Sequence, residues 1–188
     1  MAYIQTISET ESQGELAYLY KRVGNPDGTV DNVMKIHALN PDSLRTHFEM
    51  YTAAMHKPSP LSKAEREMVA TEVSRLNGCN YCLTHHNHGL IRLLPTDRHD
   101  VASELREGKH ELLSERERAL VLYARKLTTT PQQMNADDVK VLRDVGLDDR
   151  AILDLAQCIG YFNYVNRIVT GLGVALDDEE GAVGQWPE

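Results

Sequence analysis

Residues 61 to 94, LSKAEREMVATEVSRLNGCNYCLTHHNHGLIRLL, decide the fold, because they contain one complete helix signal and the beginning of another. Ser62 and Glu65 have the spacing of a capping box, in which a serine and a glutamate three residues later close the first helical turn. Apolar side chains then recur at helical spacing, at Val69, Val73 and Leu76. Asn77-Gly78 is typical of a helix C-terminus, since neither flank alternates as the strands of a β-hairpin would. The stretch predicts a helix that ends near residue 76 and a second helix that runs from Cys79 to about Leu94.

The same helical signals recur through the rest of the chain. Ser114 and Glu117 repeat the capping-box spacing, and Pro131 ends the helix that follows them. A third strong pattern starts after Asp148-Asp149 and continues towards Gly171. Weaker helices are expected over residues 10–23, 30–39, 42–56, 96–107 and 136–145. Convincing strands are absent, so the sequence predicts an all-α fold, a compact single-domain helical bundle.

The pattern of segments suggests where this domain begins and ends. We expect one all-helical domain over residues 1–176, with residues 61–94 as its motif core. Residues 177–188, DDEEGAVGQWPE, are acidic and non-periodic, so we expect a mobile tail. The pattern Leu-Ser-x-x-Glu-Arg occurs at both 61–66 and 113–118. It indicates either a degenerate internal duplication or only the recurrence of capping boxes.

Composition narrows the class of protein. The 188 residues are 41% hydrophobic and 26% charged, as in ordinary globular domains, and their formal net charge is −8. This balance lacks the basic footprint that nucleic-acid binding requires, and no apolar run approaches the length of a membrane span. The first fifteen residues do not resemble a signal peptide, so we expect the protein in the reducing cytoplasm. There, a Cys-x-x-Cys pair is more often metal-binding or catalytic than structural.

Residues 77–88 gather two cysteines and three histidines. On a helix that starts at Cys79, the spacings of three and four residues place Cys79, Cys82 and His86 on one face. The helix N-terminus and a nearby imidazole are the usual means of lowering a thiol pKa. Because a thiolate attacks peroxides and disulfides, this arrangement suits redox chemistry.

The preceding helix contributes a carboxylate to this cluster. If the two helices fold back as an antiparallel hairpin, Glu67 lies roughly 16 Å from the turn and His86 roughly 12 Å. Cys82 lies nearer the turn, so Glu67 can meet His86 more easily than it can reach either sulfur. We therefore expect a relay in which Glu67 orients and charges His86, and His86 manages the proton of Cys82.

Other interpretations of these residues stay open. Two cysteines can be buried for packing alone, which is the better interpretation for the third cysteine, Cys158. Zinc is the serious rival, with Cys79, Cys82 and His86 as ligands and a fourth from Glu67, from His85 or from a partner chain. A buried polar network is a further expectation, for Asn166-Arg167 on the apolar C-terminal helix.

The spacing Glu67, eleven residues, Cys79-x-x-Cys82, three residues, His86 resembles the signature of alkylhydroperoxidase D-like proteins. These belong to the carboxymuconolactone decarboxylase superfamily, and the similarity is greatest to the branch usually labelled peroxidase-related. Residues 163–167 and the following Gly171-Leu172-Gly173 also resemble the C-terminal helix of that family. The resemblance thus extends over roughly residues 40–176.

The resemblance implies an all-helical protein assembled as trimers or hexamers, without metal, haem or other cofactor. It implies that Cys82 attacks a small organic hydroperoxide and that Cys79 resolves the sulfenic acid to a disulfide. Glu67 and His86 would be the proton relay, and the reductant would be a dithiol, either a lipoyl group or a thioredoxin-like protein. The best-studied members have a histidine directly before the second cysteine, where this chain has Tyr81. Tyr81 and the neighbouring His85 are therefore candidate auxiliary residues.

The expectation from the sequence is a cytoplasmic alkylhydroperoxidase-like peroxidase or disulfide oxidoreductase. The alternative is a non-enzymatic redox sensor or zinc-binding oligomer that uses the same Cys79, Cys82 and His86 cluster. A cofactor-free decarboxylase or isomerase on the same scaffold is a third possibility. The cysteine pair argues against it, because the resemblance implies that such members generally lack the pair.

Overall fold

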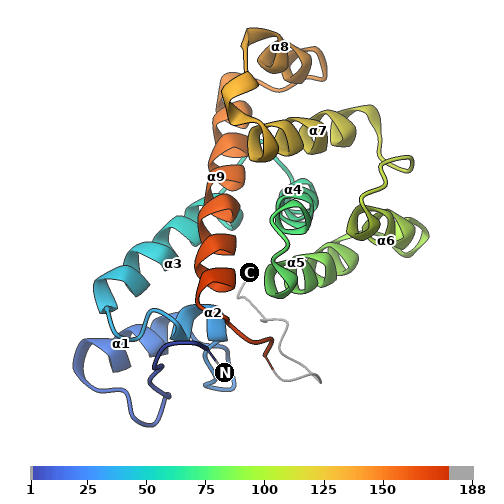
Figure 1. Ribbon diagram of the computed structural model, residues 1–188. Coiled ribbons are helices and arrows are strands. Elements are labelled where there is room, and N and C mark those ends of the chain that lie inside the picture. Colours follow the sequence, from blue (N-terminus) through green and yellow to red (C-terminus); the bar gives the residue numbers. More distant parts are fainter. Residues whose placement is uncertain (1, 178–188) are drawn as a thin grey trace. The chain divides into compact units, whose positions relative to one another are not determined.

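The computed structural model describes residues 2–177, and Figure 1 shows that they are built from helices and connecting loops. No strand occurs within this described range. The chain forms two compact units, which are residues 2–53 with 168–177, and residues 54–167. The all-α prediction is confirmed.

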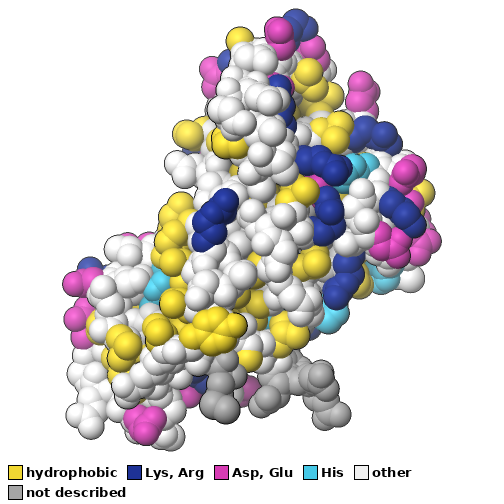
Figure 2. All heavy atoms as spheres, viewed as in Figure 1, with side chains coloured by type: hydrophobic (Ala, Val, Ile, Leu, Met, Phe, Trp, Pro, Cys, Tyr) yellow, Lys and Arg dark blue, Asp and Glu magenta, His cyan; other side chains and the backbone are white. Residues whose placement is uncertain are grey.

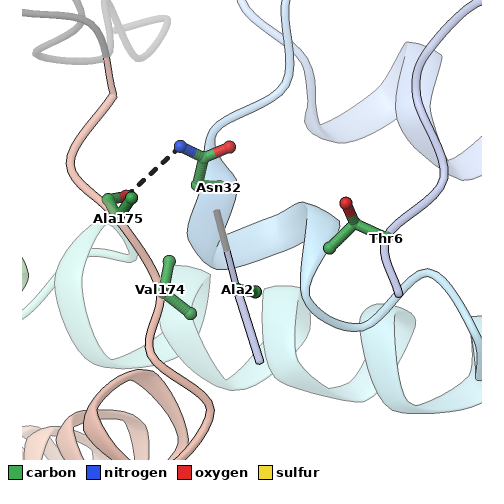
Figure 3. Close-up of a pocket in the computed structure, with 5 residues that line it drawn as sticks. All are labelled: Ala2, Thr6, Asn32, Val174 and Ala175. Carbon is green, nitrogen blue, oxygen red and sulfur yellow. Dashed lines mark hydrogen bonds between the residues drawn. The ribbon is translucent and has the colours of Figure 1, made fainter. Parts of the chain in front are cut away.

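The first unit contains α1 (Gly14–Val23), α2 (Asn32–Lys35) and most of α3 (Pro41–Met55). Its buried apolar side chains include Leu16, Leu19, Val23, Met34 and Leu44. The two ends of the described chain meet within it, since the Tyr3 amide donates to the Leu172 carbonyl at 2.8 Å. This unit also contains a small pocket of about 70 Å³. Figure 3 shows its lining residues, among which the Asn32 side-chain amide donates to the Ala175 carbonyl.

The second unit holds the remaining elements. They are α4 (Lys63–Leu76), α5 (Asn80–Leu93), the 3₁₀ turn η1 (Thr96–Arg98), α6 (His99–Glu107), α7 (Glu115–Thr129), the 3₁₀ turn η2 (Pro131–Gln133), α8 (Ala136–Asp144) and α9 (Asp149–Gly171) as far as residue 167. Helix α4 packs against α5, α6 and α7, as Figure 1 shows. Part of the core of the second unit is a cluster of buried apolar residues, Met68, Leu90, Leu94, Val101, Ala102, Leu105, Leu113 and Val121.

The helix signals of the central stretch are confirmed. Ser62 accepts from the Glu65 amide and the Glu65 carboxylate accepts from the Ser62 amide, which completes the capping box of α4. Ser114 and Glu117 make the same pair of bonds at the start of α7. Gly78 has a φ of +66°, so it allows the tight turn that sends α5 back along α4.

Several boundaries differ from the expected ones. Helix α2 is much shorter than residues 30–39, and η1 precedes α6 within residues 96–107. The two capping-box helices have different successors, since α4 leads directly into α5 whereas α7 leads into η2 and α8. The internal duplication stays a prediction. The expected mobile tail lies outside the described residues, apart from Asp177.

The surface of the described chain mixes apolar and charged side chains, as Figure 2 shows for one face. Large apolar side chains exposed in the second unit are Leu93, Leu112, Leu122, Val141, Leu153 and Tyr164. None of the helices within residues 2–177 is both long and apolar enough to cross a membrane.

Candidate thiol site

The two cysteines of the motif lie buried at the start of α5. Cys79 is the N-cap residue, and its amide donates to the Ser74 carbonyl of α4 at 2.9 Å. Cys82 is the third residue of the helix, and the exposed fractions of Cys79 and Cys82 are 1% and 3%. Their side chains are hydrogen-bonded to each other but are not joined by a disulfide. Cys79 and Cys82 are therefore both thiols, and they lie close enough to each other to form a disulfide when oxidised.

The ionisation of Cys82 is unfavourable, although a helix N-terminus and a nearby imidazole are the usual means of lowering a thiol pKa. The hydrogen bond with the Cys79 thiol and burial together raise the pKa of Cys82 well above its usual range. A hydrogen bond from the Asn166 side chain acts in the opposite direction without overcoming them. Cys82 is thus a protonated thiol near neutral pH, and its reaction as a nucleophile needs a base that removes the proton.

The contact expected between Glu67 and His86 is present. The Nδ1 atom of His86 lies 2.7 Å from Oε2 of Glu67, across the α4–α5 hairpin. Because a carboxylate only accepts hydrogen bonds, Nδ1 carries the hydrogen and Nε2 of a neutral ring keeps its lone pair. His86 follows Cys82 by one helical turn, which places the two side chains next to each other on α5. The ring of Phe162 meets His86 edge-on, with centroids 4.6 Å apart, and holds it in place.

Gly89 makes room for this carboxylate and was not singled out by the sequence. A Cβ atom added at Gly89 would lie 3.2 to 3.3 Å from three atoms of the Glu67 carboxylate. Gly89 is inside α5, where glycine costs about 1 kcal/mol relative to alanine. A glycine three residues after His86 in a helix is the sequence signal that could have indicated this close approach.

Tyr81 and His85 form a pair of their own. The Nδ1 atom of His85 donates to the Tyr81 carbonyl at 2.9 Å, and the two rings stack with centroids 4.3 Å apart. Tyr81 is buried, at 5% exposure, directly before Cys82. The stacking fixes the His85 ring against the first turn of α5.

A further histidine, His56, lies near Glu67 and carried no functional expectation. Burial lowers the pKa of His56, and the Glu67 carboxylate acts in the opposite direction. His56 is therefore a neutral neighbour of the relay near neutral pH.

Asn166 is the second site residue that the sequence did not connect with the thiols. It lies on α9, is buried, and its side chain hydrogen-bonds Cys82. The polar network expected around Asn166 is confirmed, whereas Arg167 lies at its exposed end.

The geometry of the site supports zinc binding less well than it supports the pairing of Glu67 with His86. The Glu67 carboxylate is bonded to His86, and the Nδ1 atom of His85 is bonded to Tyr81. In the part of the chain that the structure describes, no group of three or more His, Cys, Asp or Glu side chains is placed to hold a metal ion.

Comparison with known proteins agrees with this fold and site. Residues 41–94 match the model of the carboxymuconolactone decarboxylase family. An uncharacterized peroxidase-related protein from Ralstonia eutropha JMP134, described as an alkylhydroperoxidase AhpD core, is 26% identical, with a TM-score of 0.83 and coverage of 94% of this chain and 93% of that one. An uncharacterized peroxidase-related protein from Silicibacter sp. TM1040 is 31% identical, with a TM-score of 0.77 and coverage of 87% and 85%. The debrominase Bmp8 is 17% identical with a TM-score of 0.75 over 92% and 90% of the two chains, which shows a shared fold.

The fold and the paired thiols define an all-helical protein of the alkylhydroperoxidase D type. The chain belongs to the carboxymuconolactone decarboxylase family, as an AhpD-like member similar to peroxidase-related proteins.

Proposed function

We propose that this protein is a thiol-dependent peroxidase that reduces small organic hydroperoxides through Cys82 and Cys79, with Glu67 and His86 as the proton relay. The observation that carries the proposal is the 2.7 Å bond between Glu67 and His86, one helical turn from a buried, protonated Cys82. A thiol with a raised pKa needs a positioned base, and the relay is in place to act as one.

The reaction balances with these groups. His86 takes the proton of the Cys82 thiol, and the sulfur attacks the terminal oxygen of the hydroperoxide. The O–O bond breaks, Cys82 becomes a sulfenic acid, and the alkoxide leaves as an alcohol with the proton from His86. The Cys79 thiol then attacks the Cys82 sulfur, which forms a disulfide and releases water. An external dithiol reduces this disulfide and is itself oxidised to a disulfide.

Burial of both thiols favours particular partners. Since the exposed fractions of Cys79 and Cys82 are only 1% and 3%, the hydroperoxide must be small. A lipoyl group on a flexible arm reaches a buried disulfide more easily than the face of a thioredoxin-like protein does. We place this cycle in the reducing cytoplasm and in a homo-oligomer, a trimer or a hexamer, which light scattering can test.

The similarity to peroxidase-related proteins favours a hydroperoxide over other electrophiles. Both of those structures are more than 25% identical to this chain, whereas the debrominase, a variant of which was solved with 2,3,4-tribromopyrrole, shares the fold at lower identity. We therefore take the O–O bond as the bond that is cleaved.

Turnover of cumene hydroperoxide with dihydrolipoamide tests the proposal. We expect the parent and Cys158→Ser to consume peroxide, because Cys158 contacts Met55 and the Arg66 carbonyl instead of the relay. Cys82→Ser should be inactive, and Cys79→Ser should stop at a sulfenic acid that a dimedone-type reagent traps. A Cys82→Ser variant as active as the parent would exclude this mechanism.

The same preparation distinguishes the alternative function. A redox sensor would form the Cys79–Cys82 disulfide without sustained consumption of peroxide and dithiol. A zinc-binding oligomer would contain stoichiometric zinc by elemental analysis, bound through both thiols. Either result would replace the peroxidase proposal.

A further inference from the structure

Asn166 belongs to a chain of hydrogen bonds that runs from the Cys82 thiol to the surface. The Nδ2 atom of Asn77 donates to Oδ1 of Asn166 at 3.0 Å and to Oδ1 of Asn163 at 3.2 Å. The Arg167 guanidinium donates to the same Asn163 oxygen at 3.0 Å. At the inner end, Nδ2 of Asn166 donates to the Ser74 hydroxyl at 3.2 Å, and the Asn166 side chain also bonds Cys82.

The hydrogen bonds of this series can be donated in only one direction. A guanidinium has no acceptor, so the side-chain atom of Asn163 that faces Arg167 must be its oxygen. The amide nitrogen of Asn163 then donates to the Thr128 hydroxyl and the Ile159 carbonyl, at 3.1 Å each. Asn163 consequently presents an acceptor to Asn77, so the atom of Asn77 that faces it must be the nitrogen.

The same reasoning fixes the orientation of the Asn166 amide at the Cys82 sulfur. Because Asn77 presents its nitrogen, it takes the oxygen of Asn166 as its second acceptor. The nitrogen of Asn166 is thereby turned away, towards Ser74 and Cys82. Asn166 is fully enclosed, at 1% exposure, so water cannot replace this donor cheaply.

We propose that Asn166 is the amide donor that stabilises the Cys82 thiolate, and that Asn77, Asn163 and Arg167 are positioning residues that keep this amide turned to the sulfur. The proposal rests on the proposed function and deepens it, since it names the group that stabilises the thiolate on the attacking sulfur. The hydrogen bond with Cys79 and burial oppose ionisation of Cys82, and the Asn166 amide acts in the opposite direction by bonding the sulfur. Ser74 contacts both partners, since its carbonyl accepts from the Cys79 amide and its hydroxyl accepts from Asn166.

The test measures ionisation directly and does not depend on peroxidase activity. In a background of Cys79→Ser and Cys158→Ser, Cys82 is the sole thiol, and its thiolate absorbance is titrated against pH. Asn166→Asp preserves the shape of the side chain but replaces the donor by an acceptor. We expect it to raise the pKa of Cys82 by about one unit or more, a tenfold or greater loss of thiolate at a given pH.

Arg167 offers a second variant that leaves the buried residues in place. Arg167→Gln can accept as well as donate, so Asn163 can turn over, and we expect about a two- to tenfold loss of thiolate. Arg167→Lys donates only and should keep the parent pKa. Arg150→Gln, an exposed arginine paired with Asp154 on the same helix, is the matched control and should also keep it.

Two results would overturn the proposal. An unchanged pKa of Cys82 in folded Asn166→Asp excludes Asn166 as the donor. Should Asn166→Asp fail to fold, a titration of Arg167→Gln that coincides with that of Arg150→Gln excludes the positioning chain. Loss of peroxide turnover alone contradicts the proposed function but leaves this titration interpretable.

Discussion

Glu67 and His86 come from consecutive helices and meet through a 2.7 Å bond between carboxylate and imidazole. The side chains of both are mostly buried, at 16% and 14% exposure. In the proposed cycle, the carboxylate stabilises the imidazolium that forms when His86 removes the proton of Cys82. The contact therefore links the helical hairpin to the chemistry that we propose for Cys82.

Replacing the charge of Glu67 should affect the rate in a pH-dependent way. Glu67→Gln preserves shape but cannot stabilise the imidazolium, so we expect about a 10- to 100-fold slower peroxide reduction near neutral pH. The loss should shrink as the pH rises, because the Cys82 thiol, whose pKa is raised, then ionises without the relay. Initial rates measured at increasing pH, up to the highest pH at which both proteins stay folded, check this.

Asp144→Asn is the control for this variant. It also removes a carboxylate from an ion pair, with Lys140 at 2.7 Å, but on the exposed surface of α8. Its rates should equal those of the parent at every pH. A loss in Glu67→Gln that is the same factor at all pH values would show that Glu67 does not act on a proton.

Gly89→Ala should separate stability from activity. Alanine is preferred inside a helix by about 1 kcal/mol, but its Cβ must displace the Glu67 carboxylate by a few tenths of an ångström. We expect unchanged or slightly greater stability to urea and a several-fold slower peroxide reduction. Gly160→Ala on α9, where a Cβ meets no atom within 4 Å, should gain stability without losing activity. Equal activities of the two variants would contradict a role for Gly89 in placing Glu67.

Buried thiols should make the fold sensitive to alkali. Burial raises the pKa of Cys158, so the folded chain keeps this proton at a pH where the unfolded chain, with a thiol pKa of about 8.5, has lost it. The unfolded state then binds fewer protons, and the free energy of unfolding falls by about 1.4 kcal/mol per pH unit for this group as the pH rises above about 8.5. Urea unfolding at increasing pH should show a shallower decline in Cys158→Ala. An identical slope in both proteins would contradict this assignment.

Local signals made much of this molecule predictable. The capping boxes at Ser62 and Ser114 act over three residues, so the sequence alone indicates where α4 and α7 begin. The meeting of Glu67 with His86 follows from two helix lengths and one tight turn at Gly78.

What could not be predicted depends on contacts between distant segments. Asn166 reaches Cys82 from a helix some eighty residues later in the chain, which no spacing rule relates to α5. The raised pKa of Cys82 depends on its hydrogen bond with Cys79 and on burial, and neither can be read from the position of the pair at a helix N-terminus. The closeness of Gly89 to Glu67 depends on how tightly α4 and α5 pack.

The most direct measurement of the central claim is a thiol count and intact mass after one equivalent of cumene hydroperoxide. The proposed cycle predicts rapid loss of two thiols and a mass lower by two hydrogens. Peptide mapping should place the new disulfide between Cys79 and Cys82, with Cys158 still a thiol. A protein that keeps all three thiols, or that joins Cys82 to any residue other than Cys79, would contradict the account.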